Sequence, residues 1–277
     1  MQAALPHLVE DLFRHRYGAL VARLCRVLGA ERLELAEDVV QEALLSALRN
    51  WPADGVPEQP EAWVFRVARN RALDALRRSK VAGRVERELQ AFAQEAAPDG
   101  PAPDVVADDT LRMMFTCCHP AVPPDSRVPL VLKTVAGFGV PEIAGALLQK
   151  DGTIGQRLSR AKAKLQQEQV RFEVPPPQEL PARLPPVLDA LYLMFNEGWR
   201  SHRGKGLLRP DLVQEAVRLC GLLLENAPTR RPEVHALLAL MLLLGARLPA
   251  RTDALGDLLT LAEQDRSRWD REWLQCG

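Results

Sequence analysis

Apolar residues recur every three or four positions along most of this 277-residue chain, which is the spacing of one face of an α-helix. Residues 141–165 show this pattern twice, interrupted by Lys-Asp-Gly-Thr. Asp and Gly favour turns, and Asp151 or Thr153 can accept a hydrogen bond from the N–H groups that begin a second helix. The apolar positions of the two helices are Ile143, Ala144, Leu147 and Leu148, then Ile154, Leu158, Ala161 and Leu165. The sequence therefore predicts a helix-turn-helix.

The second of these helices turns a polar, cationic face away from its apolar residues. From residue 146 to residue 171 six basic residues stand against two acidic ones, whereas the whole chain balances 36 Lys and Arg against 36 Asp and Glu. Such a face can grip phosphates and read base edges in a major groove. A solvated amphipathic helix pair is the commoner explanation of a single basic face, so both interpretations stay open. The polar residues on this face are Gln156, Ser159, Arg160, Lys162 and Lys164.

Residues 34–51 form an acidic amphipathic pattern. The apolar positions that we expect to point inward are Leu35, Val39, Ala43 and Leu44. The polar positions that we expect to point outward are Glu37, Asp38, Gln41 and Glu42. An acidic face meets either water or a basic partner, and solvation is the default for an isolated cluster.

Residues 61–80 form a basic pattern, with six basic residues against two acidic ones. Its apolar positions can pack, which leaves Trp63, Phe65, Asn70 and the arginines for a partner. Flat aromatic rings beside cations bind unstacked single-stranded bases, with stacking worth about 1–3 kcal/mol per base. An aromatic residue that anchors the helix in a core is an equally good interpretation of Trp63.

The composition favours an all-α protein, because Ala, Leu, Arg and Glu are plentiful while Tyr, Phe, Ile and Thr are scarce. Five scattered cysteines are a poor basis for a secreted disulfide framework, and the N-terminus carries acids where a signal peptide needs a basic start. The longest apolar run, residues 236–244, is far short of the ~20 residues that span a bilayer. We therefore expect a soluble, cytoplasmic protein.

Cys-Cys-His at residues 117–119 suggests a metal site, but the spacing does not support one. A zinc site needs C-x₂₋₄-C and a second ligand pair, and no second pair lies nearby in the sequence. Buried, apolar thiols fit better. The chain also lacks a Gly-rich phosphate loop and a nucleophile–base pair. The sequence thus predicts no metal, no cofactor and no enzymatic activity.

Three motifs, taken in their order along the chain, carry a family resemblance. They are Glu-Asp-Val-Val-Gln-Glu at 37–42, Trp-Val-Phe-Arg-Val-Ala-Arg-Asn-Arg at 63–71, and Thr-Ile-Gly-Gln-Arg-Leu-Ser-Arg at 153–160. Together they resemble the bacterial RNA polymerase sigma factors of the extracytoplasmic-function group, over roughly residues 5–172. Cys-Cys-His-Pro at 117–120 is similar to the signature of a subgroup with long C-terminal extensions.

The resemblance implies a role for each polar group. The residues that it places on the polymerase-docking helix are Glu37, Asp38, Gln41 and Glu42. The residues that it places in the segment capturing the melted strand of the downstream promoter element are Trp63, Arg66, Arg69, Asn70, Asp74, Arg77 and Arg78. The residues that it places on the recognition helix for the upstream element are Thr153, Gln156, Arg157, Ser159, Arg160, Lys162 and Lys164.

The resemblance also implies a domain order: sigma region 2 at 1–80, an acidic flexible linker at 81–110, and sigma region 4 at 111–172. Proline-rich residues 173–186 predict a stiff hinge, followed by a helical extension at 187–277. Its helical patterns cover 187–197, 211–225, 232–247 and 267–274. The third is apolar nearly all round and should be buried. In the subgroup the extension is tetratricopeptide-like, although this sequence has no clean repeat period.

Two polar clusters stand out in the extension. They are Asn-Glu-Gly-Trp-Arg at 196–200 and Gln-Asp-Arg-Ser-Arg-Trp-Asp at 264–270. Helix capping with surface ion pairs explains either cluster, and a ligand or interdomain contact is the alternative.

The first hypothesis is therefore a sigma factor that directs core RNA polymerase to specific promoters, with an extension that regulates it. Its partners would be core polymerase and promoter DNA rather than a membrane, and an anti-sigma factor stays open. The alternative is a stand-alone helix-turn-helix regulator whose C-terminal helices bind a ligand or dimerise.

Overall fold

The computed structural model describes residues 4–78, 108–200 and 208–277. Within those ranges the regular elements are helices, and a single isolated bridge joins Thr252 to Leu258. The prediction of an all-α fold is confirmed. The predicted linker lies almost entirely outside the described residues.

The N-terminal bundle is built around its second helix. Its elements are α1 (Ala4–Leu28), the 3₁₀ helix η1 (Ala30–Arg32), α2 (Leu33–Asp54) and α3 (Pro60–Arg78). Helix α2 packs against both α1 and α3. The small residues on its buried face, which let the neighbouring backbones approach, are Ala36, Val40, Ala43 and Ala47. Gly55 ends α2 with φ of +83°, a conformation that favours glycine.

The second domain contains the helix-turn-helix. Its elements are α5 (Asp109–Cys117), α6 (Pro124–Thr134), α7 (Val140–Ala146) and α8 (Asp151–Gln167). Helix α7 packs on α8, and α8 packs on α6. The predicted apolar face of α8 is buried, at Ile154, Leu158, Ala161 and Leu165. The predicted pair of helices is confirmed.

The turn between α7 and α8 differs from the prediction in two ways. Leu148, expected on the apolar face, is 91% exposed and has φ of +52°, because the chain reverses direction there. Helix α8 starts at Asp151, with Lys150 as its N-cap and no side-chain cap. Neither Asp151 nor Thr153 can cap this helix, because both lie inside its first turn.

The extension adds three long helices and a short one. Its elements are α9 (Leu180–Trp199), α10 (Pro210–Glu225), α11 (Pro232–Gly245), the 3₁₀ helices η2 (Leu248–Ala250) and η3 (Arg266–Arg268), and α12 (Arg271–Cys276). Helices α9 and α10 cross at Gly198, where an added Cβ would lie 2.8 Å from the carbonyl oxygen of Arg209. The single helix expected at 267–274 is divided between η3 and α12, which start after the capping residues Asp265 and Asp270.

The predicted hinge extends too far toward the C-terminus. Helix α9 begins at Leu180 and continues through Pro185 and Pro186. A proline inside a helix removes a backbone hydrogen bond, so the sequence alone argues against a helix here. Leu184 and Val187 are nevertheless buried, and α9 packs on α5, α6 and α10. This packing outweighs the lost hydrogen bonds.

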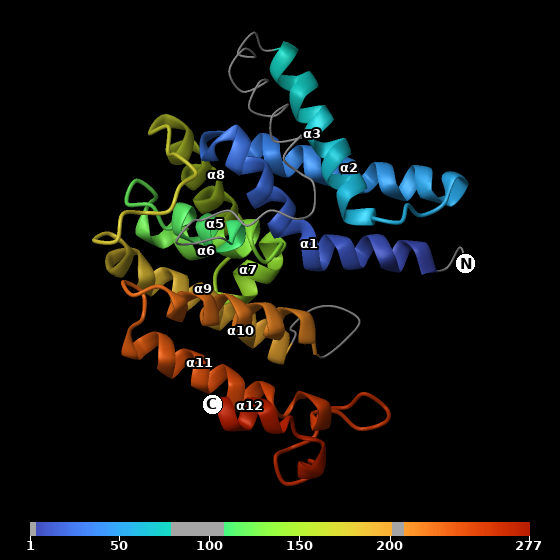
Figure 1. The fold of residues 1–277 in the computed structure, drawn as a ribbon, viewed down its shortest axis with the longest axis vertical. Helices are drawn as coiled ribbons and strands as arrows, with labels where there is room; N and C mark the ends of the chain where they lie inside the picture. The colour runs from blue at the N-terminus through green and yellow to red at the C-terminus, as the bar shows by residue number, and fades with distance from the viewer. Residues whose placement is uncertain (1–3, 79–107, 201–207) are drawn as a thin grey trace.

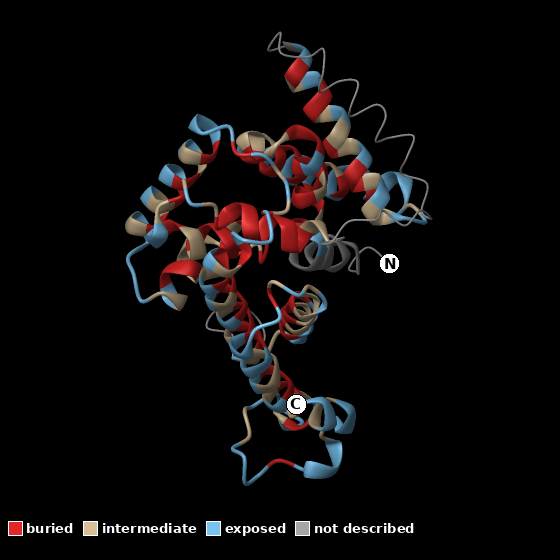
Figure 2. Ribbon diagram, turned by 60° about the vertical axis from the view of Figure 1, so that its left-hand side comes forward, coloured by how far each residue is buried: buried red, intermediate tan, exposed pale blue. Residues whose placement is uncertain are grey.

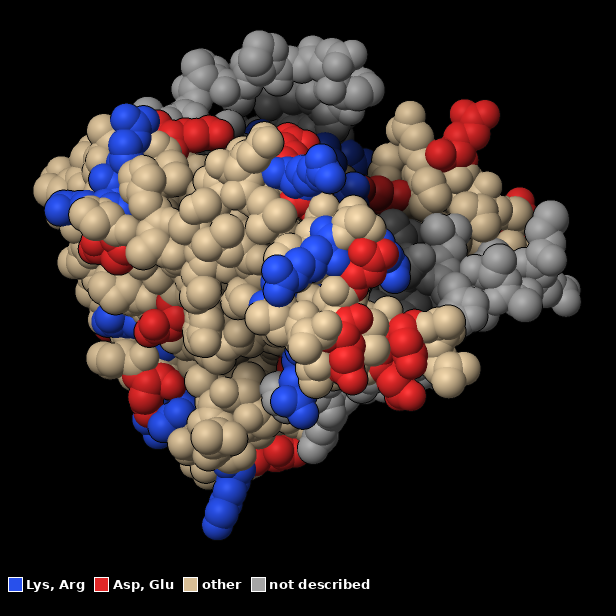
Figure 3. All heavy atoms as spheres, turned by 90° about the horizontal axis from the view of Figure 1, so that it is seen from below, with Lys and Arg blue, Asp and Glu red and all other residues tan. Residues whose placement is uncertain are grey.

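Helix α11 is not buried all round, contrary to the prediction. Leu240 and Leu243 are 42% and 43% exposed, because α9, α10 and α12 cover only part of its circumference. Figure 3 views this end of the molecule and shows a broad uncharged area beside interspersed acidic and basic side chains. Among the described residues, Pro232–Ala250 is long and apolar enough to cross a membrane by length and composition, a test that helices of soluble proteins also pass.

The three parts of the chain are stacked in tiers, with α3 at the top of Figure 1, α5–α7 in the middle and α11 and α12 at the bottom. Helix α1 packs on α5 and α6, and α8 packs on η1. A Cβ added to Gly18 of α1 would lie 2.2 Å from the carbonyl oxygen of Val135. Figure 2 shows the buried residues concentrated where these tiers meet. The first two domains therefore share one interface rather than sitting apart.

The cysteines of the second domain are core residues, as predicted. Cys117 and Cys118 are buried thiols without a disulfide, and the Sγ of Cys117 lies 3.3 Å from the Oγ1 of Thr134. Burial raises the pKa of Cys117 to about 12 and raises that of Cys118 as well. Both thiols therefore stay protonated in this core at neutral pH.

Candidate polymerase and nucleic-acid interfaces

Part of the polar face of α3 is open to solvent. Arg66, Asn70 and Asp74 are exposed. Arg69 Nη2 donates to Asn70 Oδ1 at 3.3 Å, and Arg77 Nη1 lies 3.8 Å from Asp74 Oδ1. These contacts run along the helix itself, so they orient the polar side chains without covering them.

The two aromatic residues at the start of α3 differ in exposure. Trp63 is partly exposed, and its ring meets that of Trp51 edge-on, with centroids 5.4 Å apart. Phe65 is buried, and the guanidinium of Arg23 covers its ring at 4.2 Å. The expectation that the aromatics face a partner is therefore wrong for Phe65. The side chain of Arg78 lies outside the described residues.

Most of the acidic face of α2 is exposed, as expected. Asp38, Gln41 and Glu42 all face solvent. Gln41 Nε2 donates to the hydroxyl of Tyr17 at 3.4 Å, and Arg71 of α3 donates to the carboxylate of Glu42. The Arg71 contact joins α3 to α2 and occupies one of the predicted docking residues.

Glu37 points into the interface between the first two domains, and the expectation that it points outward is wrong. It is 3% exposed, and its Oε2 lies 2.5 Å from the Nζ of Lys162 on α8. Its other oxygen is buried without a hydrogen-bond partner among the described residues. The packing of α8 beside the start of α2 covers a residue that would face water if α2 stood alone.

The predicted DNA-reading residues of α8 fall into two groups. The exposed group is Gln156, Ser159 and Arg160, and the partly buried group is Thr153, Arg157, Lys162 and Lys164. Arg157 Nε lies 3.1 Å from the Oδ2 of Asp125 at the start of α6. Lys162 is held by Glu37. Two of the cations that the sequence assigns to DNA are therefore paired within the protein.

A cleft of about 710 Å³ lies between the start of α2 and α8. The polar residues that line it include Glu31, Glu34, Asp38, Ser159, Lys162 and Gln166. Of the predicted site residues, Asp38 of the docking helix and Ser159 and Lys162 of the recognition helix thus line one cleft. Among the described residues, none of the predicted site residues of α3 lines it.

Comparison with known proteins assigns the chain to a family. Residues 12–81 match the family described as Sigma-70 region 2, and residues 112–165 match Sigma-70, region 4. The ECF RNA polymerase sigma factor SigM of Mycobacterium tuberculosis is 30% identical over 162 residues, which is 56% of this chain and 74% of the relative. The chain belongs to the extracytoplasmic-function (ECF) sigma factors.

Three further matches show how much of the chain is similar to other proteins. RNA polymerase sigma factor CarQ of Myxococcus xanthus is 33% identical over 162 residues, which is 57% of this chain and 87% of the relative. An uncharacterized protein of Rhizobium meliloti is 37% identical over 265 residues, and this sigma factor spans 62% of that relative's length. Residues 183–277 match a family of unknown function (DUF6596). No solved structure matches the chain.

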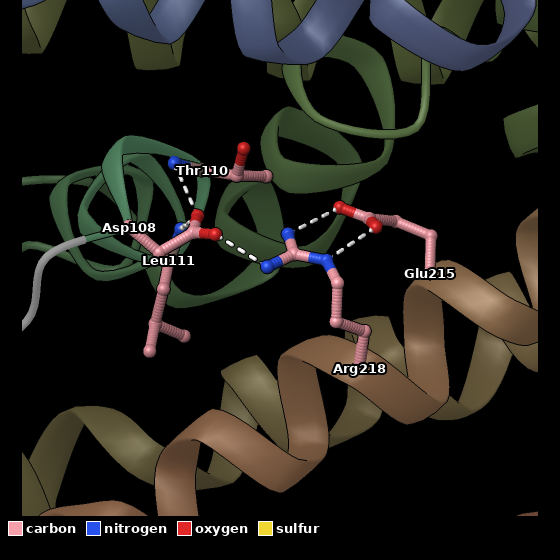
Figure 4. A network of polar contacts seen from close by, with 5 residues as sticks. All are labelled: Asp108, Thr110, Leu111, Glu215 and Arg218. Atoms are coloured by element: carbon pink, nitrogen blue, oxygen red, sulfur yellow. Dashed lines mark hydrogen bonds and ion pairs between the residues drawn. The ribbon is translucent and has the colours of Figure 1, made fainter. Parts of the chain in front are cut away.

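The extension of this sigma factor is tied to region 4 by polar contacts. Arg218 of α10 donates to Glu215 at 2.7 and 2.8 Å, and its Nη1 lies 2.5 Å from the Oδ2 of Asp108 (Figure 4). Hydrogen bonds to Glu215 and Asp108 raise the pKa of Arg218. Nearby, Arg209 Nη1 lies 3.7 Å from the Oε1 of Glu142 on α7.

Asp108 also caps α5. Its Oδ1 accepts hydrogen bonds from the backbone N–H groups of Thr110 and Leu111, at 2.8 and 3.1 Å (Figure 4). An Asp just before a helical pattern is a local signal that sequence reasoning could have used. The partnership of Asp108 with Arg218 leaves no such signal, because the two residues are 110 positions apart.

Proposed function

We propose that this sigma factor directs core RNA polymerase to specific promoters and initiates transcription there, in the cytoplasm. The observation that carries the proposal is the open face of α3, where Arg66 and Asn70 are exposed and Trp63 is partly exposed. An unstacked strand can reach cations and an aromatic ring on this face. The matches to sigma-70 regions 2 and 4, in that order, support the same role.

Run-off transcription with core polymerase tests the proposal. The full chain should start transcripts at a discrete promoter, and core polymerase alone should not. Asp38→Lys should prevent capture of core polymerase, because Asp38 is an exposed acid on the proposed docking helix. Glu58→Lys is the matched control, since Glu58 is exposed in the loop after α2. Normal polymerase binding by Asp38→Lys would contradict the docking assignment.

We assign binding of the upstream promoter element to α8. Arg157→Ala combined with Arg160→Ala should weaken binding to duplex DNA that carries this element, because two cations leave the proposed recognition face. Lys150→Ala is the control, since Lys150 is the N-cap and lies before α8. Unchanged initiation by the double variant would remove the recognition-helix assignment.

The proposal includes a regulatory role for the extension. Arg218 and Arg209 attach it to region 4, while α8 packs against η1 and faces α2 across the cleft. In this arrangement α2 and α8 cannot both present their full polar faces to large partners. We therefore assign to the extension a regulatory role that acts through region 4, the domain to which these contacts attach it.

Gly18→Ala tests this closed arrangement. The added Cβ would meet the Val135 carbonyl at 2.2 Å, so the two domains should separate and the radius of gyration in small-angle X-ray scattering should rise. Binding of upstream-element DNA should rise with it. Gly221→Ala is the control, because a Cβ at Gly221 meets nothing within 4 Å. An unchanged radius and unchanged DNA binding would argue against the closed arrangement of regions 2 and 4.

A further inference from the structure

The two polar sequence clusters of the extension meet around one side chain. Arg247 places its Cζ 5.4 Å from the ring centre of Trp199 and 5.9 Å from that of Trp269. The Cζ of Arg251 lies 4.7 Å from Trp199, and that of Arg266 lies 5.6 Å from Trp269. The arginine–tryptophan cluster is the set Trp199, Arg200, Arg247, Arg251, Arg266 and Trp269.

No acid neutralises this cluster within the described parts of the chain. No ion pair there involves any of its four arginines. Burial, together with the charges of Arg247 and Arg200, lowers the pKa of Arg251, so the neighbours of this guanidinium repel rather than balance its charge. Residues 201–207, which follow Arg200, contain no Asp or Glu in their sequence.

Most of the acids that follow Arg251 in the sequence are committed to turns and caps. Asp253 Oδ1 accepts the backbone N–H groups of Leu255 and Asp257, both at 2.9 Å. The other acids of this segment that accept a backbone N–H are Glu263, Asp265 and Asp270. These carboxylates stabilise the loops and caps of the extension rather than pairing with the arginines of the cluster.

The guanidinium groups are held in place but keep donors to spare. Arg247 Nε donates to Gln264 Oε1 at 3.3 Å, and Gln264 is itself 5% exposed. Arg251 Nη1 donates to the carbonyl of Leu259 at 3.1 Å, and its Nε is buried without a partner in the described structure. A guanidinium carries five N–H donors in a fixed plane, and stacking on an indole ring leaves the donor edges accessible.

We infer that the arginine–tryptophan cluster binds the phosphate or carboxylate group of a small anionic molecule. Attraction to the indole rings holds each arginine, but it does not remove the repulsion between the arginines. An oxyanion removes that repulsion and accepts the remaining N–H groups in a bidentate manner. The site lies in the extension, outside the surfaces assigned to polymerase and DNA.

Isothermal titration of the full chain tests this inference. Inorganic phosphate and citrate are titrated separately, in chloride buffer at constant ionic strength. At least one should bind saturably, and Arg247→Gln and Arg251→Gln should each weaken that binding at least tenfold. Arg268→Gln is the matched control, because Arg268 is exposed beside the cluster and takes no part in the ring contacts found among the described residues. Its affinity should equal that of the unaltered chain.

The two ligands separate the two possible chemistries. Binding of phosphate alone assigns a phosphorylated ligand, and binding of citrate alone assigns a carboxylated one. Saturable binding of neither, or equal loss in Arg268→Gln and Arg251→Gln, overturns the inference. Far-UV circular dichroism checks that each variant is folded, and Arg247→Lys, which keeps the charge but loses the planar fork, should show an intermediate loss. The assay contains no polymerase or DNA, so its failure leaves the proposed sigma function untouched.

Discussion

Helices α3 and α8 are both cationic and amphipathic, yet they stand in different surroundings. On α3, Arg69 donates to Asn70 of the same helix, and Arg66 is exposed. On α8, Arg157 and Lys162 reach acids on α6 and α2. The polar side chains of a helix at the edge of a bundle can stay exposed, whereas those of a helix between two domains pair with residues of its neighbours. Availability of a binding face is thus a tertiary property, even where its charge is a local one.

The largest expected difference between the two helices is in stability. Lys162→Ala should lower the free energy of unfolding by about 3 kcal/mol, because it leaves Glu37 buried without its partner. Arg66→Ala should change it by less than about 0.5 kcal/mol, since Arg66 is exposed. Urea unfolding followed by circular dichroism measures both. Glu37→Leu combined with Lys162→Met should recover most of the lost stability. Equal losses in Lys162→Ala and Arg66→Ala would contradict the difference proposed between α8 and α3.

Strand capture should depend on α3 and not on α8. Trp63→Ala should weaken binding of the holoenzyme to a pre-melted promoter by roughly fivefold to 150-fold, which corresponds to about 1–3 kcal/mol for one stacked base. Fluorescence anisotropy on a labelled bubble template measures this affinity. Tyr192→Ala is the control, because Tyr192 is an exposed aromatic residue on α9. A loss confined to fully duplex DNA would count against the role of α3.

Salt dependence should show which form of DNA each helix contacts. Arg66→Gln should reduce the slope of log affinity against log salt by about 0.7 on the melted template, the value for one single-strand phosphate contact. Arg160→Gln should reduce it by about 0.9 on duplex upstream DNA. Titrations from low to moderate potassium chloride give both slopes. If both variants reduced the slope on the same template, α3 and α8 would not contact different forms of DNA.

The smallest expected effect is at the contact between α3 and α2. Arg71→Ala should cost about 0.5 kcal/mol of stability, because the Arg71 and Glu42 side chains are 41% and 55% exposed and water screens their attraction. The same change leaves Glu42 without Arg71, so polymerase binding should be equal or slightly tighter in a pull-down. The stability of Arg71→Lys should lie between that of Arg71→Ala and that of the unaltered chain. A large loss of stability would show that this pair holds the bundle together.

Local chemistry explains what the sequence could predict. The apolar spacing of Ile154, Leu158 and Leu165 gave α8 its buried face, and the poor zinc spacing of Cys117 and Cys118 argued for plain core thiols. Each of these features depends on residues within a few positions of one another. The order of three such motifs was enough to indicate the family.

Contacts between distant segments explain what the sequence could not predict. Glu37 would point outward from α2 if α8 did not pack beside it. Leu148 is exposed because its backbone adopts a positive φ in the turn between α7 and α8. Pro185 belongs to α9 because of the helices around it. The roles of the promoter and polymerase residues remain predictions.

Asp108 joins two structural roles in one carboxylate. One oxygen accepts hydrogen bonds from the first backbone N–H groups of α5, and the other contacts Arg218 of the extension. Detachment of the extension therefore changes the field at the first turn of α5, and movement of that turn loosens the hold on the extension. The start of α5 and the docking of α10 thus share one carboxylate.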